Sequence, residues 1–473
     1  MTQPPHQNQS ESVPAQLGLW DAVSIIVGIV VGVSIFRVPA MIFSNVEGPW
    51  QGMGVWAIGG LLSLVGALCY AELATTYPRS GGDYVYLTRA YGPLVGFLFG
   101  WAQLVAILTG SIGAMAYTFS DYAVTLFESD ASLGVWLAVA AVLVLTLINL
   151  LGVVAGKTTQ NLLTAAKVTG LVVIVAAGFL WGGSASLHAS QPMEGPGLGL
   201  AMVFVLYAFG GWNDAAFVAA EVRNRQQNIP RALILGTSGI TLIYLLTNAA
   251  YLFGLGFEGV RASAAPAADL LKNLIGEWGS TGMSLLVMIS ALGAINGLIF
   301  TGSRIYASLG NDYGLFAWLG RWHPRLGTPI WSLCTQSAVS VLLIAAVGTQ
   351  FGRNAIDNVL IRIGLGSLPW QNYHGGFNTL VAATAPVFWF FFLLTGLSLF
   401  VLRVKDRHVR RPFSVPLFPI VPVVFCLTCT YMLFSSVMYA RSLTLLGFVP
   451  VLLGLPLYVI SRKNPSVGAD QPV

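Results

Sequence analysis

Charged residues are scarce in this chain. Only 9% of its 473 residues are Asp, Glu, Lys or Arg, whereas 56% are hydrophobic and the mean hydropathy is +0.75. A water-soluble domain could not bury that much apolar surface. The low charge content therefore excludes a soluble globular protein and indicates a membrane protein.

Cysteine and histidine are also rare, with 4 and 5 copies. The cysteines fall in apolar stretches and the histidines are scattered, so neither forms a metal-ligand pattern. The sequence has no nucleophile-base pair, no phosphate-binding glycine loop and no basic run interleaved with aromatic residues. We therefore expect no metal, no cofactor, no nucleic-acid partner and no enzymatic activity.

Long apolar runs take the place of these motifs. Each can cross about 30 Å of hydrocarbon, which takes about 20 residues, with allowance for tilt and some shorter spans. The twelve runs are Leu19–Phe43, Met53–Thr76, Leu94–Phe119, Leu133–Val154, Leu162–Trp181, Leu198–Ala220, Ala232–Phe257, Met283–Leu309, Ile330–Val347, Leu380–Val404, Phe418–Met438 and Leu443–Ile460. The sequence predicts an all-α integral membrane protein with twelve transmembrane helices.

The basic residues lie unevenly between these runs. An even number of runs puts both termini in one compartment, and the connections on that side carry sixteen Lys and Arg against six on the other. Because Lys and Arg in short loops stay in the cytoplasm, both termini are predicted to be cytoplasmic. We expect a multi-pass protein of the plasma or inner membrane, surrounded by lipids.

Small residues interrupt two of the runs. The first contains Gly32-Val33-Ser34-Ile35-Phe36 and the sixth Ala208-Phe209-Gly210-Gly211-Trp212-Asn213. Inside a bilayer the backbone leaves the helix only where it lines a cavity, because an unsatisfied amide in hydrocarbon is costly. Matched interruptions in two halves of a chain indicate a transport site. Close helix packing at small residues is the other interpretation, and the interruptions alone leave it open.

The two breaks would offer opposite partial charges. The N–H groups of Val33, Ser34 and Ile35 would begin a new half-helix, whose positive end suits a carboxylate. The carbonyls of Tyr207 and Gly210 would accept hydrogen bonds from an ammonium group. An α-amino acid carries both groups close together, so it is the predicted ligand.

The position of the breaks also predicts the organisation of the chain. Each break opens a unit of five runs, and two runs remain at the end. The predicted parts are a disordered tail at 1–16, a first repeat at 17–185, a second repeat at 196–404, two extra helices at 405–463 and a tail at 464–473. If the repeats are inverted copies, the two breaks meet near the midplane.

Longer strings accompany the breaks. They are Tyr70-Ala71-Glu72-Leu73, Pro78-Arg79-Ser80-Gly81-Gly82-Asp83-Tyr84-Val85-Tyr86, Asn228-Ile229-Pro230-Arg231, Arg411-Pro412-Phe413 and Pro416-Leu417-Phe418-Pro419. On the basis of these strings and the two breaks, the chain resembles the amino acid-polyamine-organocation superfamily from about residue 17 to 463. It most resembles the L-type amino acid transporter branch. The resemblance implies a LeuT-type fold with five-plus-five inverted repeats, in which a bundle rocks against a scaffold.

The resemblance also implies a substrate site. Its residues would be Val30, Gly32, Val33, Ser34, Ile35, Tyr207, Phe209, Gly210, Gly211 and Asn213. The amides of Val33 and Ser34 would bind the carboxylate, the carbonyls of Val30, Tyr207 and Gly210 the amino group, and Tyr207 would be a gating aromatic. The family usually reads Gly-Ser-Gly-Ile-Phe at the first break. Here Val33 and Ser34 keep the backbone donors but change the side chains, so an altered size preference is expected.

Lys167 is the predicted coupling residue. It lies five positions past Leu162, about 7.5 Å into the fifth run at 1.5 Å per residue, where a charge usually has a function or a partner. In sodium-coupled relatives the matching region helps to hold sodium, so an ammonium group there implies transport without sodium. A side chain that snorkels toward the cytosol is the alternative.

Other polar and aromatic residues have simpler interpretations. Glu72 and Asp21, near span ends, are expected to be structural, and Asn296 and Tyr306 to make interhelical hydrogen bonds. Trp389 is expected to pack. The segment 351–377 is either an external lid or a surface helix. Relatives in eukaryotes bond a heavy chain through a cysteine in the loop matching 127–133, which has none here, so no disulfide-linked heavy chain is expected.

These observations together predict a secondary transporter of neutral amino acids that works by alternating access, most simply a sodium-independent exchanger. A proton-coupled symporter is the alternative within the class, with Lys167 as the group that would lose its proton. An ion channel is the alternative from another class. A membrane enzyme fits least, because no catalytic constellation is visible.

Overall fold

The computed structural model describes residues 15–181, 197–263, 265–362, 364, 366–368, 370 and 375–462. Most of the predicted N-terminal tail, the predicted C-terminal tail and the junction between the two predicted repeats lie outside the described residues. The described part is helical, with no strand and two isolated backbone bridges, one of which joins Leu17 to Val222.

The helices fall into two series, one before and one after the junction. The first comprises α1 Leu19–Val30, α2 Ser34–Phe43, α3 Pro49–Thr76, α4 Asp83–Tyr91, α5 Pro93–Ala102, the π-helical turn η1 Gln103–Ile107, α6 Leu108–Leu126, the 3-10 turn η2 Ala131–Leu133, α7 Gly134–Leu150 and α8 Val153–Trp181. The second comprises α9 Leu198–Ala208, the 3-10 helix η3 Trp212–Glu221, α10 Arg225–Ala262, α11 Pro266–Ile275, α12 Glu277–Asp312, the 3-10 turn η4 Gly314–Phe316, α13 Ile330–Gly348, α14 Gln350–Arg362, α15 Gly375–Lys405, α16 Ile420–Ala440, α17 Leu443–Leu452 and α18 Gly454–Arg462.

The number of membrane-crossing helices is close to the twelve predicted. Ten helical segments of the described chain are long and apolar enough to cross a bilayer, and α1 with α2 forms a further one that bends by 51°. Helix α7 is apolar but only 17 residues long, which a thinned bilayer accommodates. Proline begins α3, α5 and α11, where its missing N–H costs nothing.

Several helices extend beyond their predicted runs. Helix α8 begins at Val153, nine residues before the predicted Leu162, and α10 begins at Arg225 rather than Ala232. Hydropathy marks only the apolar part of a helix, so the polar stretch 157–161 of α8 and the polar first turn of α10 were missed. The sixth span also differs after its break, because it continues as the 3-10 helix η3 and not as an α-helix.

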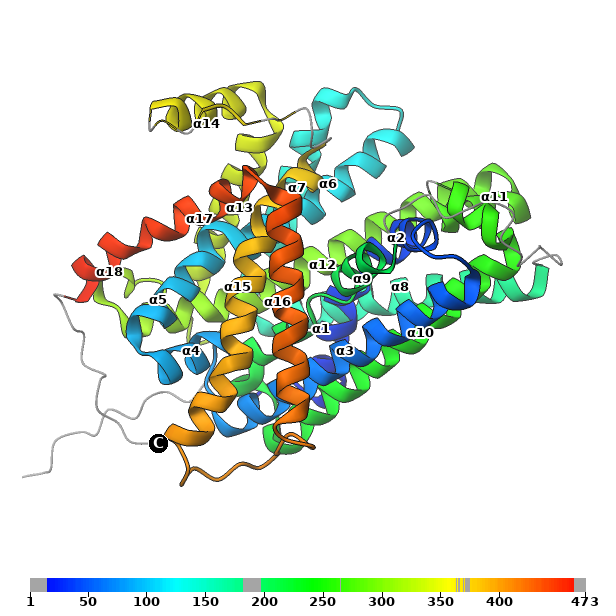
Figure 1. The fold of residues 1–473 in the computed structure, drawn as a ribbon. Coiled ribbons are helices and arrows are strands. Elements are labelled where there is room, and N and C mark those ends of the chain that lie inside the picture. Colours follow the sequence, from blue (N-terminus) through cyan, green and yellow to red (C-terminus); the bar gives the residue numbers. More distant parts are fainter. Residues whose placement is uncertain are drawn as a thin grey trace, which may run out of the picture.

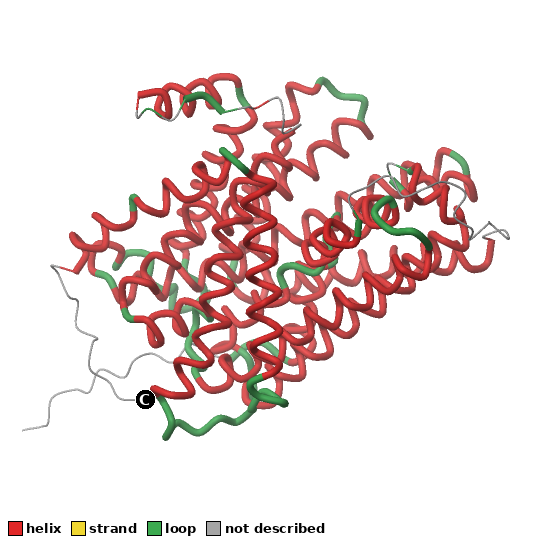
Figure 2. Tube along the Cα trace, in the orientation of Figure 1, coloured by secondary structure: helices red, strands yellow, loops and turns green. Residues whose placement is uncertain are grey.

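The long helices pack side by side around the two broken spans (Figure 1). Helix α10 lies along α3 and α1, α12 lies along α6 and α8, and α15 lies along α16. Helix segments dominate the whole trace, and short loops join them (Figure 2). A continuous buried apolar core runs through all of these elements, so the broken spans are enclosed by protein.

The segment at 351–377 contains a helix. Helix α14 lies at the end of the molecule far from the α15–α16 connection (Figure 1). Its Leu360, together with Leu368, packs on Ala382, Ala440 and Leu443. The Asp357 carboxylate accepts hydrogen bonds from the Leu368 N–H at 3.0 Å and the Trp370 indole at 2.9 Å. Helix α14 and the described residues Leu368 and Trp370 thus pack on α15, α16 and α17 near that end of the molecule.

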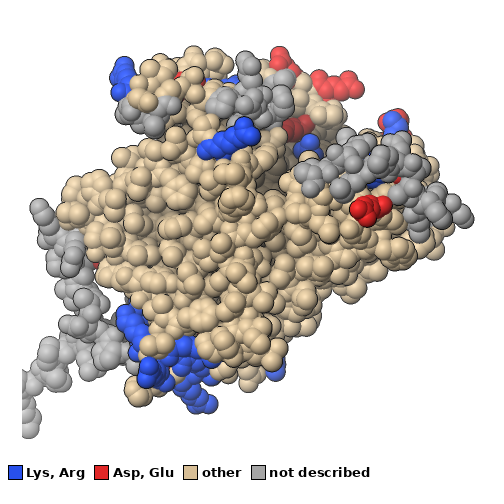
Figure 3. Space-filling model, in the orientation of Figure 1, with Lys and Arg blue, Asp and Glu red and all other residues tan. Residues whose placement is uncertain are grey.

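Charge is distributed unequally between the two ends (Figure 3). Blue Lys and Arg atoms gather at the end where α15 meets α16, whereas red Asp and Glu atoms appear mainly at the other end. The connection 406–419 holds Arg407, Arg410 and Arg411. A wide tan belt separates the ends, as expected of a protein whose middle faces lipid.

Candidate functional site

The first broken span bends where small residues interrupt it. Helix α1 ends at Val30 and α2 begins at Ser34, and Val31 has a non-helical ψ of 68°. The first N–H groups of α2 have no partner within that helix, because the carbonyls four residues earlier lie before its start. The start of α2 is therefore a partly positive end inside the membrane-spanning part.

The second broken span needs glycine. Helix α9 ends at Ala208 and η3 begins at Trp212, with Gly211 between them at a φ of +106°. A Cβ on Gly211 would lie 2.6 Å from the Ile29 Cγ2 atom of α1. Gly211 therefore allows both the left-handed backbone and the close approach of the two broken spans.

A cavity of about 170 Å³ lies where the two breaks meet. Its wall comes from both broken spans and from three further spans. The lining residues are Ile29, Val30, Gly32, Val33, Ser34, Gln103, Ile107, Leu108, Ser111, Ala114, Met115, Leu206, Tyr207, Ala208, Gly210, Gly211, Asn213, Asp214, Ala294, Leu298, Val381, Thr384, Ala385, Phe388 and Trp389. Backbone that leaves the helix here lines a cavity, as the bilayer requires.

The cavity extends from the breaks toward the end of the molecule that carries α14. Its lining on α15 runs from Val381 to Trp389, which is the half of that helix nearer to Gly375. On the third span its lining runs from Gln103 to Met115, past the middle of that span. The cavity thus faces the predicted external side.

Eight of the ten predicted substrate residues line this cavity. They are Val30, Gly32, Val33, Ser34, Tyr207, Gly210, Gly211 and Asn213. The other two do not. Phe209 is buried and its ring packs on Trp56 and Tyr244, with ring centroids 6.2 and 5.0 Å apart. Ile35 is fully buried one residue into α2. Sequence could not separate these two because consecutive residues of a helix point in different directions.

Tyr244 ties the two breaks together. Its hydroxyl on α10 lies 2.9 Å from the Val30 carbonyl oxygen and 3.1 Å from the Ala208 carbonyl oxygen. One hydroxyl hydrogen serves two acceptors, so Tyr244 can donate fully to only one of the two carbonyls at a time. The Val30 carbonyl oxygen also accepts from the Gly32 N–H at 2.6 Å.

Lys167 lies beside the first break. Its side chain is fully buried, and its Nζ donates to the carbonyl oxygens of Gly28 at 2.7 Å, Val31 at 3.0 Å and Ser290 at 3.1 Å. A Cβ on Gly293 would lie 2.9 Å from this Nζ, so the glycine makes room for it. The side chain does not reach toward the end of the span, as a snorkelling lysine would. Helix α8 begins at Val153, so Lys167 lies deep within it.

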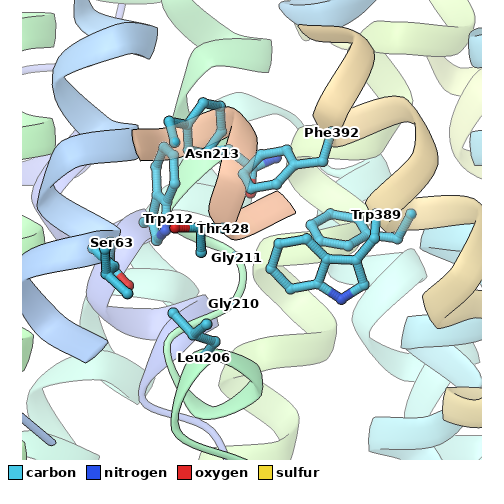
Figure 4. A pocket seen from close by; sticks show the side chains of 12 residues that line it. Ser63, Leu206, Gly210, Gly211, Trp212, Asn213, Trp389, Phe392 and Thr428 are labelled. Carbon is cyan, nitrogen blue, oxygen red and sulfur yellow. The ribbon is translucent and has the colours of Figure 1, made fainter. Parts of the chain in front are cut away.

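A second, smaller cavity of about 20 Å³ lies on the other side of the sixth break. Figure 4 shows Ser63 of α3 and Trp389 of α15 on opposite sides of the segment that carries Gly210 and Gly211. Trp389 lines both cavities, with its ring centroid 5.5 Å from that of Phe392. Trp389 thus packs, as predicted, and it also lines the cavities, which an aromatic in an apolar run gives no sign of.

Four polar residues of the cavity wall were not foreseen, namely Gln103, Ser111, Asp214 and Thr384. Asp214 lies in the first turn of η3, and Gln103 opens the π-helical turn η1. A π-helical turn inside an α-helix often marks a functional site. Asp214 is the only acidic residue in the predicted sixth run, which was a signal available from the sequence.

The remaining polar predictions on the spans agree with the structure. The Asn296 amide donates to the Gln160 side-chain oxygen at 2.8 Å and accepts from the Asn149 amide at 2.8 Å. The Tyr306 hydroxyl donates to the Gln103 carbonyl oxygen at 3.0 Å. Glu72 and Asp21 form ion pairs near span ends, with Arg403 and Lys157.

Below the cavity, buried contacts hold η3 in place. Glu221 and Arg304 form a bidentate ion pair at 2.7 and 2.9 Å, and both side chains are 1% exposed. The Gly81 N–H of the Ser-Gly-Gly string donates to the Phe217 carbonyl oxygen at 3.0 Å. These contacts close the side of the molecule that faces the termini.

Comparisons with known proteins identify the family. The family model described as "Amino acid permease" matches residues 17–459. The chain is 29% identical to the human b(0,+)-type amino acid transporter 1, over 91% of this chain and 84% of that protein. It is 30% identical to the mouse large neutral amino acids transporter small subunit 2, over 94% and 80%. It is 28% identical to the human cystine/glutamate transporter, over 98% and 89%.

A solved structure has the same fold. It is Mhp1, a nucleobase-cation-symport-1 family transporter, in a closed conformation with bromovinylhydantoin bound. The TM-score is 0.57 at 14% identity, over 98% of this chain and 97% of that one. The predicted LeuT-type fold is thereby confirmed. The broken spans, the cavity between them and the match along almost its whole length show that this chain belongs to the amino acid permease family of membrane transporters.

Proposed function

We propose that this chain moves neutral L-amino acids across the membrane by alternating access, as a sodium-independent exchanger. The observation that carries the proposal is the single cavity lined by both broken spans. The relatives named for b(0,+)-type and large neutral amino acids support this substrate class. A zwitterion fits because the two breaks present opposite partial charges.

The substrate roles follow from the ends of the half-helices. The carboxylate lies against the N–H groups at the start of α2, those of Val33 and Ser34. The ammonium donates to carbonyl oxygens at the ends of α1 and α9, those of Val30, Tyr207 and Gly210. Tyr207 lines the cavity beside them and acts as the gating aromatic.

Lys167 supports transport without sodium. Its ammonium already occupies the space between α1 and α12 and donates to three carbonyl oxygens, from Gly28, Val31 and Ser290. Those oxygens are the ligands a sodium ion would need there, and a fixed positive charge repels a second cation. Lys167 is thus the coupling residue of the proposal.

The proposal includes the membrane, the orientation and the partners. The protein lies in the plasma or inner membrane with both termini in the cytoplasm, which the excess of basic residues at that end supports. It works without a disulfide-linked heavy chain, since the loop 127–133 has no cysteine. One relative is named a small subunit, so this point needs its own measurement. A single species on non-reducing gels of native membranes is expected, and a larger species that reduction releases contradicts it.

Purified protein in lipid vesicles tests the function. Vesicles loaded with leucine are expected to take up labelled leucine, whereas empty vesicles are not, and replacing sodium is expected to change nothing. Uptake into empty vesicles that follows an imposed pH gradient contradicts exchange and supports the proton symporter. Electrical currents far larger than turnover-limited transport allows, without exchange, contradict both the exchanger and the symporter and support a channel.

A further inference from the structure

Gln103 brings a side-chain amide to the wall of the cavity. The residue opens the π-helical turn η1, lines the cavity and is 4% exposed. Its backbone carbonyl oxygen accepts hydrogen bonds from the Leu108 N–H and, at 3.0 Å, from the Tyr306 hydroxyl. These bonds fix the backbone of the turn, so the place of the side chain on the wall is set before a substrate arrives.

The side-chain oxygen of Gln103 has no hydrogen-bond donor among the described residues. The Tyr306 hydroxyl is committed to the backbone of Gln103. The Ser111 hydroxyl, from the same span, donates to the Ile107 carbonyl oxygen at 2.8 Å. A buried amide oxygen without a donor costs free energy, so a donor carried by what the cavity holds is favoured there.

A second amide on the cavity wall is in a similar state. Asn213 of η3 lines the cavity at 2% exposure, and its side-chain oxygen also has no donor within the described part of the chain. Its amide nitrogen donates to Asp214 Oδ1 at 3.2 Å. The third and the sixth span thus each bring an amide with unused hydrogen-bonding capacity to the same cavity.

A carboxamide is the chemical group that matches this capacity. It has two N–H donors and a carbonyl acceptor side by side, so it can pair with the Gln103 amide whichever way that amide is turned. It is also neutral, so burying it does not require a charged partner. A hydroxyl group offers one donor, and an apolar side chain offers none.

We propose that Gln103 is a specificity-determining residue that recognises a carboxamide on the substrate side chain, so that the transporter favours glutamine and asparagine over apolar amino acids of the same size. This inference rests on the proposed function, because it needs the amino acid to be held by the two breaks. The substrate N–H donates to the Gln103 side-chain oxygen, and Asn213 offers a second acceptor. An apolar side chain leaves these oxygens unpaired, which disfavours it.

Competition against labelled leucine in leucine-loaded vesicles tests this inference. Asparagine and leucine are matched competitors because their side chains have the same shape, and glutamine and methionine have side chains of the same length. In the wild type, each amide is expected to compete at least as well as its apolar partner. Apolar partners that compete more than about tenfold better overturn the inference without any variant. Leucine exchange itself reports separately on the proposed function.

The variant Gln103→Met sharpens the test, because it removes the amide and keeps the length of the side chain. It is expected to shift the ratio of glutamine to methionine competition toward methionine by at least about fivefold. An unchanged ratio overturns the inference. Gln103→Glu keeps an acceptor for the substrate N–H groups and is expected to keep the amide preference, which covers the case that Gln103→Met does not fold. A preference of Gln103→Glu for methionine overturns the inference.

Gln336→Met is the matched control. Gln336 of α13 is fully buried and its side-chain oxygen also has no donor among the described residues, but it does not line the cavity. This change is expected to keep the ratio of glutamine to methionine competition. The same shift in Gln103→Met and Gln336→Met overturns direct contact between Gln103 and the substrate.

Discussion

Gly211 shows how a single residue lets two broken helices approach each other. Its φ is +106°, and a Cβ there would meet Ile29 Cγ2 at 2.6 Å. Both constraints act on the same backbone segment that lines the cavity. A side chain at this position has to move one break away from the other.

Gly211→Ala is therefore expected to weaken amino acid binding. Overpacking costs about 1–3 kcal/mol, which, if it falls on binding, corresponds to a loss of about fivefold to 150-fold in affinity. Binding of leucine to the purified protein measures it. Gly239→Ala is the control, because a Cβ on this helical glycine meets nothing within 4 Å. Equal affinity in both variants would refute the role of close approach.

Lys167→Met removes the ammonium and keeps most of the stem. The carbonyl oxygens of Gly28, Val31 and Ser290 then lose a shared donor. At about 1–3 kcal/mol for buried groups left unsatisfied, leucine exchange is expected to fall about tenfold or more. Lys157→Met on the same helix is the control, since Lys157 is 23% exposed and is expected to matter little. A stronger effect at Lys157 would contradict the assignment of Lys167.

The residues also show what sequence could and could not predict. The glycine-rich breaks and Lys167 were visible because each violates the rules for an uninterrupted apolar helix. Phe209 was assigned to the site and Trp389 was not. The direction in which each side chain points depends on how α9 and α15 are rotated against their neighbours, which the sequence does not give. Asp214 was visible as an acid in an apolar run, but its access to the cavity depends on the break before it.

At the scale of elements, η3 is fastened to α12 by one buried ion pair. Arg304→Met leaves the Glu221 carboxylate buried without its partner, so the stability is expected to fall by about 3–5 kcal/mol. Thermal unfolding in detergent measures it. Lys272→Met breaks the exposed pair with Glu277, where the side chains are 54% and 80% exposed, and is expected to change the melting temperature little. Similar losses from the two changes would contradict the account.

The loop after α15 is anchored to α4 by Asp406. Its carboxylate accepts hydrogen bonds from Tyr77 at 2.7 Å and from Arg89 Nη2 at 3.1 Å. Burial raises the pKa of Asp406, but the hydrogen bonds from Arg89 and Tyr77 outweigh it and hold the pKa below its ordinary value of 3.8. The anchor therefore stabilises the fold fully above that ordinary value, and the contribution is lost as the pH falls through the lower native value.

Comparing the wild type with Asp406→Asn tests this anchor. The wild type is expected to melt at a higher temperature at neutral pH, and the difference is expected to shrink once the pH falls below about 4. Melting curves between pH 7 and pH 3 provide the measurement. A difference that stays constant over this range would mean that the carboxylate charge is not what stabilises the loop.

At the scale of the whole molecule, hydropathy and charge were enough to predict the membrane spans. The contacts between helices could not be predicted from the sequence. Apolar runs identify spans because the bilayer demands them, so the predicted number of spans is close to the ten or eleven of the described chain. Polar parts of helices, such as residues 157–161 of α8 and the first turn of α10, carry no hydropathy signal and were missed. The 3-10 conformation of η3 depends on its packing against α1, α10 and α12, which no local pattern contains.

The central claim is that both broken spans bind one amino acid, and a structure of the protein with bound leucine tests it most directly. The account predicts leucine in the cavity, with its carboxylate on the Val33 and Ser34 N–H groups and its ammonium on the carbonyls of Val30, Tyr207 or Gly210. Leucine bound away from the two breaks, or an empty cavity at saturating leucine, would contradict it.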